Sequence, residues 1–224
     1  MSLVFYFLAI ITLEFTLWIG YCCLRSRALS KKTKNFVCED KVYQKKVLMI
    51  GDSVIRGVGT SHGGNSLPAL ITKRSPTIHV TVCAQDGARC REVLQVCREK
   101  RFKKFHQVIL FCGGMDIIYF SRTDEIKRNL AELFSHAKSI SPNVVYVSPA
   151  DVGSAPVFPF PISYIYTYRS RKFLDISREC AKTYGVTFVD YFSIRNTHYA
   201  EDKSHPNDNG YRNLFNLFKH HIVE

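Results

Sequence analysis

From residue 46 onward, apolar residues follow two different spacings. Short, nearly continuous apolar runs are typical of buried strands, and they occur at 46–50, 78–84, 107–112, 143–148 and 186–190. Longer segments with apolar residues at helical spacing lie near 88–100, 122–140, 169–184 and 207–222. Strands that alternate with helices predict an α/β domain, in which a mostly parallel five-stranded sheet lies between two layers of helices.

The first part of the chain has neither spacing. Residues 3–24 form an almost unbroken apolar run, and about 20 such residues can span a bilayer. No basic segment precedes this run and no small-residue cleavage site closes it, so a transmembrane helix is favoured over a cleaved signal peptide. Glu14 is the discordant residue in the run, either a tolerated carboxyl or a helix–helix contact.

The charged residues next to this anchor predict its orientation in the membrane. The segment after it is basic, with Arg25, Arg27, Lys31, Lys32 and Lys34. The positive-inside rule therefore predicts a single-pass protein whose folded domain lies on the cytoplasmic face of the membrane. We accordingly divide the chain into an anchor (1–24), a basic linker (25–45) and a folded domain (46–224).

The whole chain is also basic, because 31 Lys and Arg residues exceed 19 Asp and Glu to give a net charge of +12. Such a balance favours anionic surroundings, either phospholipid headgroups or nucleic acid. Zinc-finger spacing and RNP-like aromatic runs are absent from the sequence, so we expect lipid and no nucleic acid.

Eight cysteines contain no Cys-x-x-Cys pair. Cys83 and Cys112 fall in apolar strand runs, and Cys90 and Cys97 share one face of a predicted helix. All four are expected to be small core residues, and unpaired thiols agree with a reducing compartment.

Two polar blocks lie where chemistry is expected. Gly51-Asp52-Ser53 ends the first strand, and ligands bind beyond the carboxyl ends of parallel strands. Far downstream, Asp202 stands three residues before His205, so its carboxylate can fix one ring nitrogen while the other takes a proton from a serine. Taken separately, the first block also fits a turn with a helix cap, and the second a surface histidine. Together they supply a nucleophile, a base and an orienting group.

These blocks resemble the SGNH (GDSL-type) serine hydrolases, in order and spacing, over roughly residues 46–215. The resemblance implies a flavodoxin-like three-layer α/β/α fold, with Ser53 as nucleophile, His205 as base and Asp202 as its orienting group. It also implies that the N–H groups of Ser53 and Gly87 form an oxyanion hole. One position departs from the family, because Met115 replaces its asparagine.

That replacement bears directly on activity. Methionine has no N–H to donate, and loss of one oxyanion donor typically costs about 10²–10³ in turnover. The expected protein is a membrane-anchored serine hydrolase that cleaves an ester or acylated lipid, weakened at Met115. A catalytically silent lipid- or glycan-binding module and an acyltransferase using the same serine are the alternatives. No metal-ligand cluster is evident, and neither a metal nor a cofactor is expected.

The segment 155–172 combines three prolines with several aromatic residues after the fourth predicted strand. Proline prevents a regular element at its start. One hypothesis is an acyl-binding wall or membrane-resting lid, with Arg169, Arg171 and Lys172 at the headgroups. The alternative is a loop packed on its own core.

Overall fold

A parallel sheet lies at the centre of the computed structural model, which describes residues 2–39, 42–194 and 197–223. The spatial order of its five strands is β2-β1-β3-β4-β5. The strands are β1 (Lys45–Gly51), β2 (Ile78–Ala84), β3 (Gln107–Phe111), β4 (Val144–Val147) and β5 (Thr187–Val189). Gly51 pairs in register with Ala84 on one side and Phe111 on the other, so β1, β2 and β3 end at the same edge.

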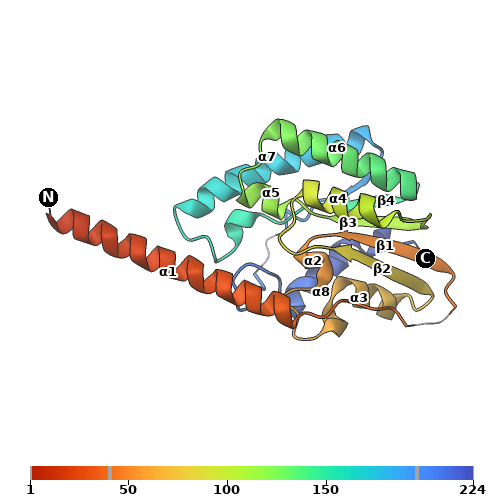
Figure 1. Cartoon of the computed structure of the whole chain (residues 1–224), viewed down its shortest axis with the longest axis horizontal. Helices are drawn as coiled ribbons and strands as arrows, with labels where there is room; N and C mark the ends of the chain where they lie inside the picture. The colour runs from red at the N-terminus through yellow and green to blue at the C-terminus, as the bar shows by residue number, and fades with distance from the viewer. Residues whose placement is uncertain (1, 40–41, 195–196, 224) are drawn as a thin grey trace.

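Helices cover both faces of this sheet (Figure 1). Leu48 and Ile50 of β1 pack in the core beneath α4 (Cys90–Lys100), α6 (Thr123–Ile140) and α7 (Ile162–Thr183). Val47 and Met49 point the other way, into the core formed with α3 (Leu67–Arg74) and α8 (Asp208–Phe218). Because successive strand residues face opposite sides, one apolar run feeds two cores. The predicted α/β/α fold is confirmed.

Helix α1 (Ser2–Lys32) projects from the domain (Figure 1). Its segment Ala9–Lys32 is the only part of the described residues that forms a helix long and apolar enough to cross a membrane. The helix does not stop at residue 24, so the first part of the predicted linker is helical. Residues 25–32 contain no glycine or proline, and leucine, arginine, lysine and alanine all favour helix.

Other differences from the predicted elements are local. Short helices occur at α2 (Ser53–Arg56), α5 (Gly114–Ile118), η1 (Gly63–Asn65), η2 (Val152–Ser154) and η3 (Lys219–His221). Helix α7 begins directly after Pro161 and not near 169. Its first turns expose Tyr164, Ile165 and Tyr168, so they lack the amphipathic pattern from which a helix is predicted.

Candidate active site

Ser53 lies at the corner where β1 passes into α2. Asp52 is the N-cap of that helix, and its carboxylate accepts the backbone N–H of Val54 at 3.0 Å. Asp52 is buried, and burial raises its pKa to about 6. The turn-and-cap interpretation is therefore correct for Asp52, while it leaves the neighbouring hydroxyl free for another partner.

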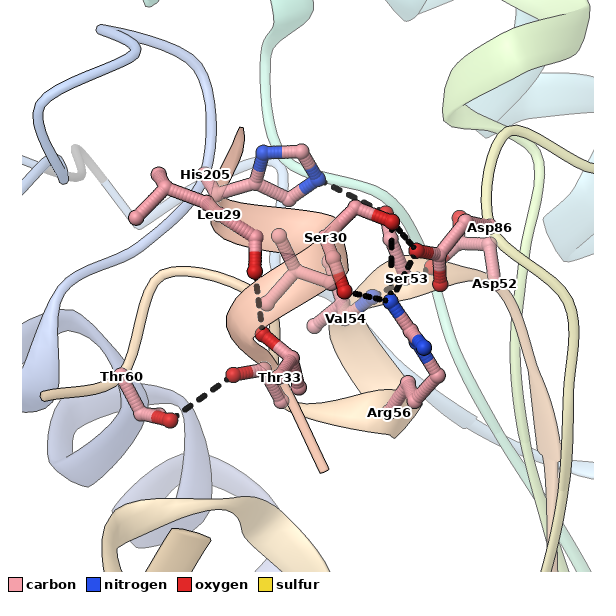
Figure 2. Close-up of polar contacts among 12 residues, drawn as sticks. Leu29, Ser30, Thr33, Asp52, Ser53, Val54, Arg56, Thr60, Asp86 and His205 are labelled. Carbon is pink, nitrogen blue, oxygen red and sulfur yellow. Dashed lines mark hydrogen bonds and ion pairs between the residues drawn. The ribbon is translucent and has the colours of Figure 1, made fainter. Parts of the chain in front are cut away.

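That partner is His205. The Ser53 Oγ and the His205 Nε2 lie 2.8 Å apart (Figure 2). On the other side of the ring, Nδ1 lies 2.5 Å from the Asp202 carboxylate. Because an ionised carboxylate only accepts, Nδ1 carries the proton and Nε2 is left to accept the serine O–H. The structure thus brings together three side chains from opposite ends of the chain.

Asp202 also holds the loop on which His205 stands. Its second carboxylate oxygen accepts the N–H groups of Ser204 at 3.1 Å and of His205 at 3.0 Å, and the side chain is 0% exposed. Burial alone raises the pKa of this carboxyl, but the hydrogen bonds and charge of His205, with the Ser204 N–H, bring the pKa below its ordinary value. Asp202 is therefore ionised at neutral pH.

A glycine-rich loop supports the histidine from behind. Gly59 has φ +100°, and a Cβ at this position would lie 2.4 Å from the carbonyl oxygen of Pro206. The Tyr211 hydroxyl donates to the Val58 carbonyl oxygen at 2.8 Å and fixes the same loop to α8. Gly59 thus helps to form the site, and its signal in the sequence is the cluster of glycines at positions 57, 59, 63 and 64.

Ser53 and Gly87 line one cavity, and each has a backbone N–H group. Within the described residues, the N–H groups of Ser53 and Gly87 take part in no hydrogen bond. Gly87 has φ +69°, a conformation that favours glycine. Met115, near the start of α5, lines the same cavity. Its neighbour Asp116 is buried, and its carboxylate accepts the Cys90 N–H at 2.8 Å, so it ties α5 to α4.

A cavity of about 550 Å³ adjoins these groups and falls in the usual range for small-molecule sites. Ser53 and His205 line it, as do Gly87 and Met115. A smaller chamber of about 120 Å³ shares Ser53 and His205 and extends toward Tyr191. The Ser53 hydroxyl therefore lies where two spaces meet.

The sequence model of the GDSL-like lipase/acylhydrolase family matches residues 49–212, which is most of the chain and includes Ser53, Asp202 and His205. The chain belongs to this family. It is an ester-cleaving hydrolase of the GDSL type. No curated protein matches the acylhydrolase chain.

Solved structures similar to this acylhydrolase share its fold. TesA has a TM-score of 0.64 and 16% identity, over 79% of this chain and 97% of TesA. A lipase/acylhydrolase from Enterococcus faecalis has a TM-score of 0.62 and 18% identity, over 80% of this chain and 95% of its own. The acetylxylan esterase Axe2 from Geobacillus stearothermophilus has a TM-score of 0.61 and 19% identity, over 83% and 97%.

The proline-rich segment of the acylhydrolase stays irregular until Pro161, as expected. Phe158 packs on Tyr166 with ring centroids 4.2 Å apart, and both line the larger cavity. Arg169 does not face outward as the lid hypothesis required. It donates to the carbonyl oxygens of Ile117 and Ser121 at 3.2 and 2.9 Å, and thereby fastens the end of α5 to α7.

The cysteines behave as the sequence predicts. All eight are free, and Cys83, Cys90, Cys97 and Cys112 are buried. They face one another in pairs around α4, with Sγ atoms 3.8 Å apart for Cys83 and Cys97 and 3.6 Å apart for Cys90 and Cys112. Among the described residues, no cluster of histidine, cysteine or acidic side chains is suited to a metal ion.

Proposed function

We propose that this acylhydrolase cleaves acyl esters through a covalent acyl-enzyme on Ser53. The observation that carries the proposal is the continuous chain of hydrogen bonds from Ser53 through His205 to Asp202. The Ser53 Oγ attacks the ester carbonyl carbon while His205 Nε2 takes the hydroxyl proton. The carbon–oxygen bond to the alcohol then breaks, and His205 returns the proton to the departing oxygen. Water, activated by the same ring, next attacks the acyl-enzyme and releases the acid.

Negative charge that develops on the carbonyl oxygen has two proposed partners, the N–H groups of Ser53 and Gly87. Both are without a protein acceptor in the described residues, which supports this assignment. Methionine at 115 supplies no third donor. We therefore expect turnover below that of a site with asparagine at this position, but not zero.

We further propose that α1 anchors the enzyme in a membrane and that the basic residues after it keep the domain on the cytoplasmic face. The length and apolar character of the helix support the first part, and the arginines and lysines of 25–34 support the second. Protease added to intact cells should then leave the domain uncut until the cells are lysed. Cleavage of the domain in intact cells would contradict the proposed orientation and place the domain outside the cell.

The test of chemistry uses the full chain in detergent. Ester hydrolysis of p-nitrophenyl acetate and labelling by a fluorophosphonate should both disappear in Ser53→Ala and persist in Ser139→Ala, a matched change of an exposed serine on α6. With glycerol in excess, the acyl group should still be released as the free acid. Transfer of the acyl group to glycerol would instead identify an acyltransferase. Absence of both turnover and labelling in the wild-type protein would leave a silent binding module.

A further inference from the structure

One stripe of α1 packs against the acylhydrolase domain. Trp18, Cys22, Ser26 and Ser30 recur every four residues and so share a face of the helix. The Trp18 indole N–H donates to the carbonyl oxygen of Val157 at 3.3 Å, and Cys22 is 2% exposed. Residues 5, 6 and 9–14 of the same helix are exposed instead. The second half of α1 is therefore built into the domain, while residues 5, 6 and 9–14 of the first half are exposed.

The end of α1 is also tied to the turn that carries Gly87 (Figure 2). The Ser30 hydroxyl donates to the carboxylate of Asp86, the residue before Gly87. Arg56 donates to the same carboxylate and, at 2.6 Å, to the Ser30 carbonyl oxygen. Because Arg56 ends the helix that begins with Ser53, α1 contacts both segments that hold the proposed oxyanion donors.

The packed half of α1 forms one wall of the larger cavity. Phe15, Ile19 and Cys23 line it from the helix, in the same space as Ser53 and His205. Tyr119, Phe158, Ile162 and Tyr166 also line this space. A mainly apolar chamber that reaches from the nucleophile along a long apolar helix suits a hydrocarbon chain better than a polar or sugar group.

Exposed aromatic residues gather at the start of α7 and the end of α5, including Tyr119, Phe120, Phe160 (79% exposed), Tyr164 and Tyr168. Exposed Arg171 and Lys172 follow on α7. The start of α7 lies on the side of the domain from which α1 projects (Figure 1). Aromatic residues followed by cations are the order found where a protein enters the headgroup region of a bilayer.

The length of the apolar run in α1 indicates where the exposed aromatic surface lies relative to a bilayer. Residues 3–24 rise about 33 Å at 1.5 Å per residue, close to the thickness of a hydrocarbon core. Residues 15–24 of that run lie on the half of α1 that packs against the domain. These ten residues account for about 15 Å of the run at 1.5 Å per residue, so immersing the run in a bilayer carries the adjoining face of the domain, and the cavity beneath it, into the near leaflet.

We infer that α1 is a working part of the active site and not only an anchor. It walls the acyl-binding chamber, and the chamber opens at the bilayer, so that the substrates are long-chain acyl esters of membrane lipids taken directly from the membrane. This inference rests on the hydrolase function proposed above, and it adds the substrate class and its route of entry.

The first experiment compares palmitate with acetate p-nitrophenyl esters, using the full chain in mixed micelles. Ile19→Trp, which fills the chamber, should lower the palmitate-to-acetate ratio of kcat/KM by about ten-fold or more. Cys23→Trp, at an exposed position on the same wall, should do so without a folding cost. Leu17→Trp, 63% exposed and outside the chamber, should leave the ratio unchanged. Equal losses on both esters, or an unchanged ratio in both wall variants, would overturn the inference.

The second experiment measures position without activity. The chain has a single tryptophan, so Trp18→Phe combined with Phe160→Trp moves the fluorophore to the domain rim. In vesicles of phosphatidylcholine and phosphatidylglycerol, acyl-brominated lipid should quench this tryptophan more than aqueous acrylamide does. Quenching by acrylamide alone would place the rim in water and overturn the route from the bilayer. Ser53-dependent cleavage of the acetate ester would, in that case, leave the hydrolase function standing.

Discussion

Asp202→Asn separates two tasks that one carboxylate performs. One oxygen accepts the backbone N–H groups of Ser204 and His205, and the other faces His205 Nδ1. An asparagine can keep its carbonyl oxygen on the two N–H groups, which leaves its NH₂ facing the ring. Nδ1 must then accept, so the ring proton moves to Nε2 and the base can no longer take the proton of Ser53.

The expected magnitude follows from this change of tautomer. The backbone hydrogen bonds remain, so the thermal unfolding midpoint should move by only a few degrees, corresponding to about 1 kcal/mol. The turnover number should fall by about 10⁴, which equals about 5 kcal/mol in the activation barrier. Stability and catalysis should therefore separate clearly in one variant.

The assay is hydrolysis of p-nitrophenyl acetate by the full chain, with circular dichroism on the same samples. Asp208→Asn is the matched control, because that carboxylate lies three residues after His205 and accepts from Ser61 at the edge of the domain. The control should keep nearly full turnover. The tautomer argument is refuted by an Asp202→Asn enzyme that is folded and retains more than about a tenth of wild-type turnover.

Three further changes test other parts of the site. Met115→Asn should raise the turnover number, by up to about 10², if its amide reaches the oxyanion, and Met115→Leu should not. Gly59→Ala should lower turnover, because the new methyl group would push the Pro206 carbonyl oxygen beside His205, and the strain of about 1–3 kcal/mol should lower the thermal unfolding midpoint. The control Gly63→Ala meets nothing within 4 Å and should change neither turnover nor the unfolding midpoint. The pKa of Asp52 is about 6 in the folded protein against an ordinary value of 3.8, so its contribution to stability is present below pH 3.8 and is lost as the pH rises through 6. Asp52→Asn should therefore raise the unfolding midpoint at pH 8, by an amount worth about 3 kcal/mol, with no gain near pH 4; a pH-independent difference would contradict this.

Elements with a strong apolar period could be predicted from the sequence. Strands β1 and β3 are buried on both faces, so they appear as short continuous apolar runs, and α6 carries a stripe with helical spacing. The meeting of Ser53 with His205 was expected from the family resemblance and from the position of each block at an element boundary. Both kinds of signal are local, so neither needs knowledge of the distant packing.

Features that depend on distant contacts could not be predicted in this way. The stripe of α1 that packs on the domain is hidden because residues 15–24 are apolar on nearly every side. Arg169 belongs to a basic segment, and only the folded chain shows that its guanidinium group donates hydrogen bonds to carbonyl oxygens of α5 and of the following turn. Gly59 is one glycine among several, and its importance comes from a carbonyl oxygen far along the chain.

Helix α1 runs from Ser2 to Lys32 without a break, and Ser30 near its end accepts a hydrogen bond from Arg56, in the helix that begins with Ser53. Within the described residues, α1 therefore has no hinge between its apolar end and the contacts of Ser30 with Arg56 and Asp86. A single residue inserted at position 14 would turn the outer half of the helix by about 100° about its axis relative to the enzyme. In the proposed membrane-anchored enzyme, the tilt and rotation of α1 therefore set the direction in which the Ser53 hydroxyl faces.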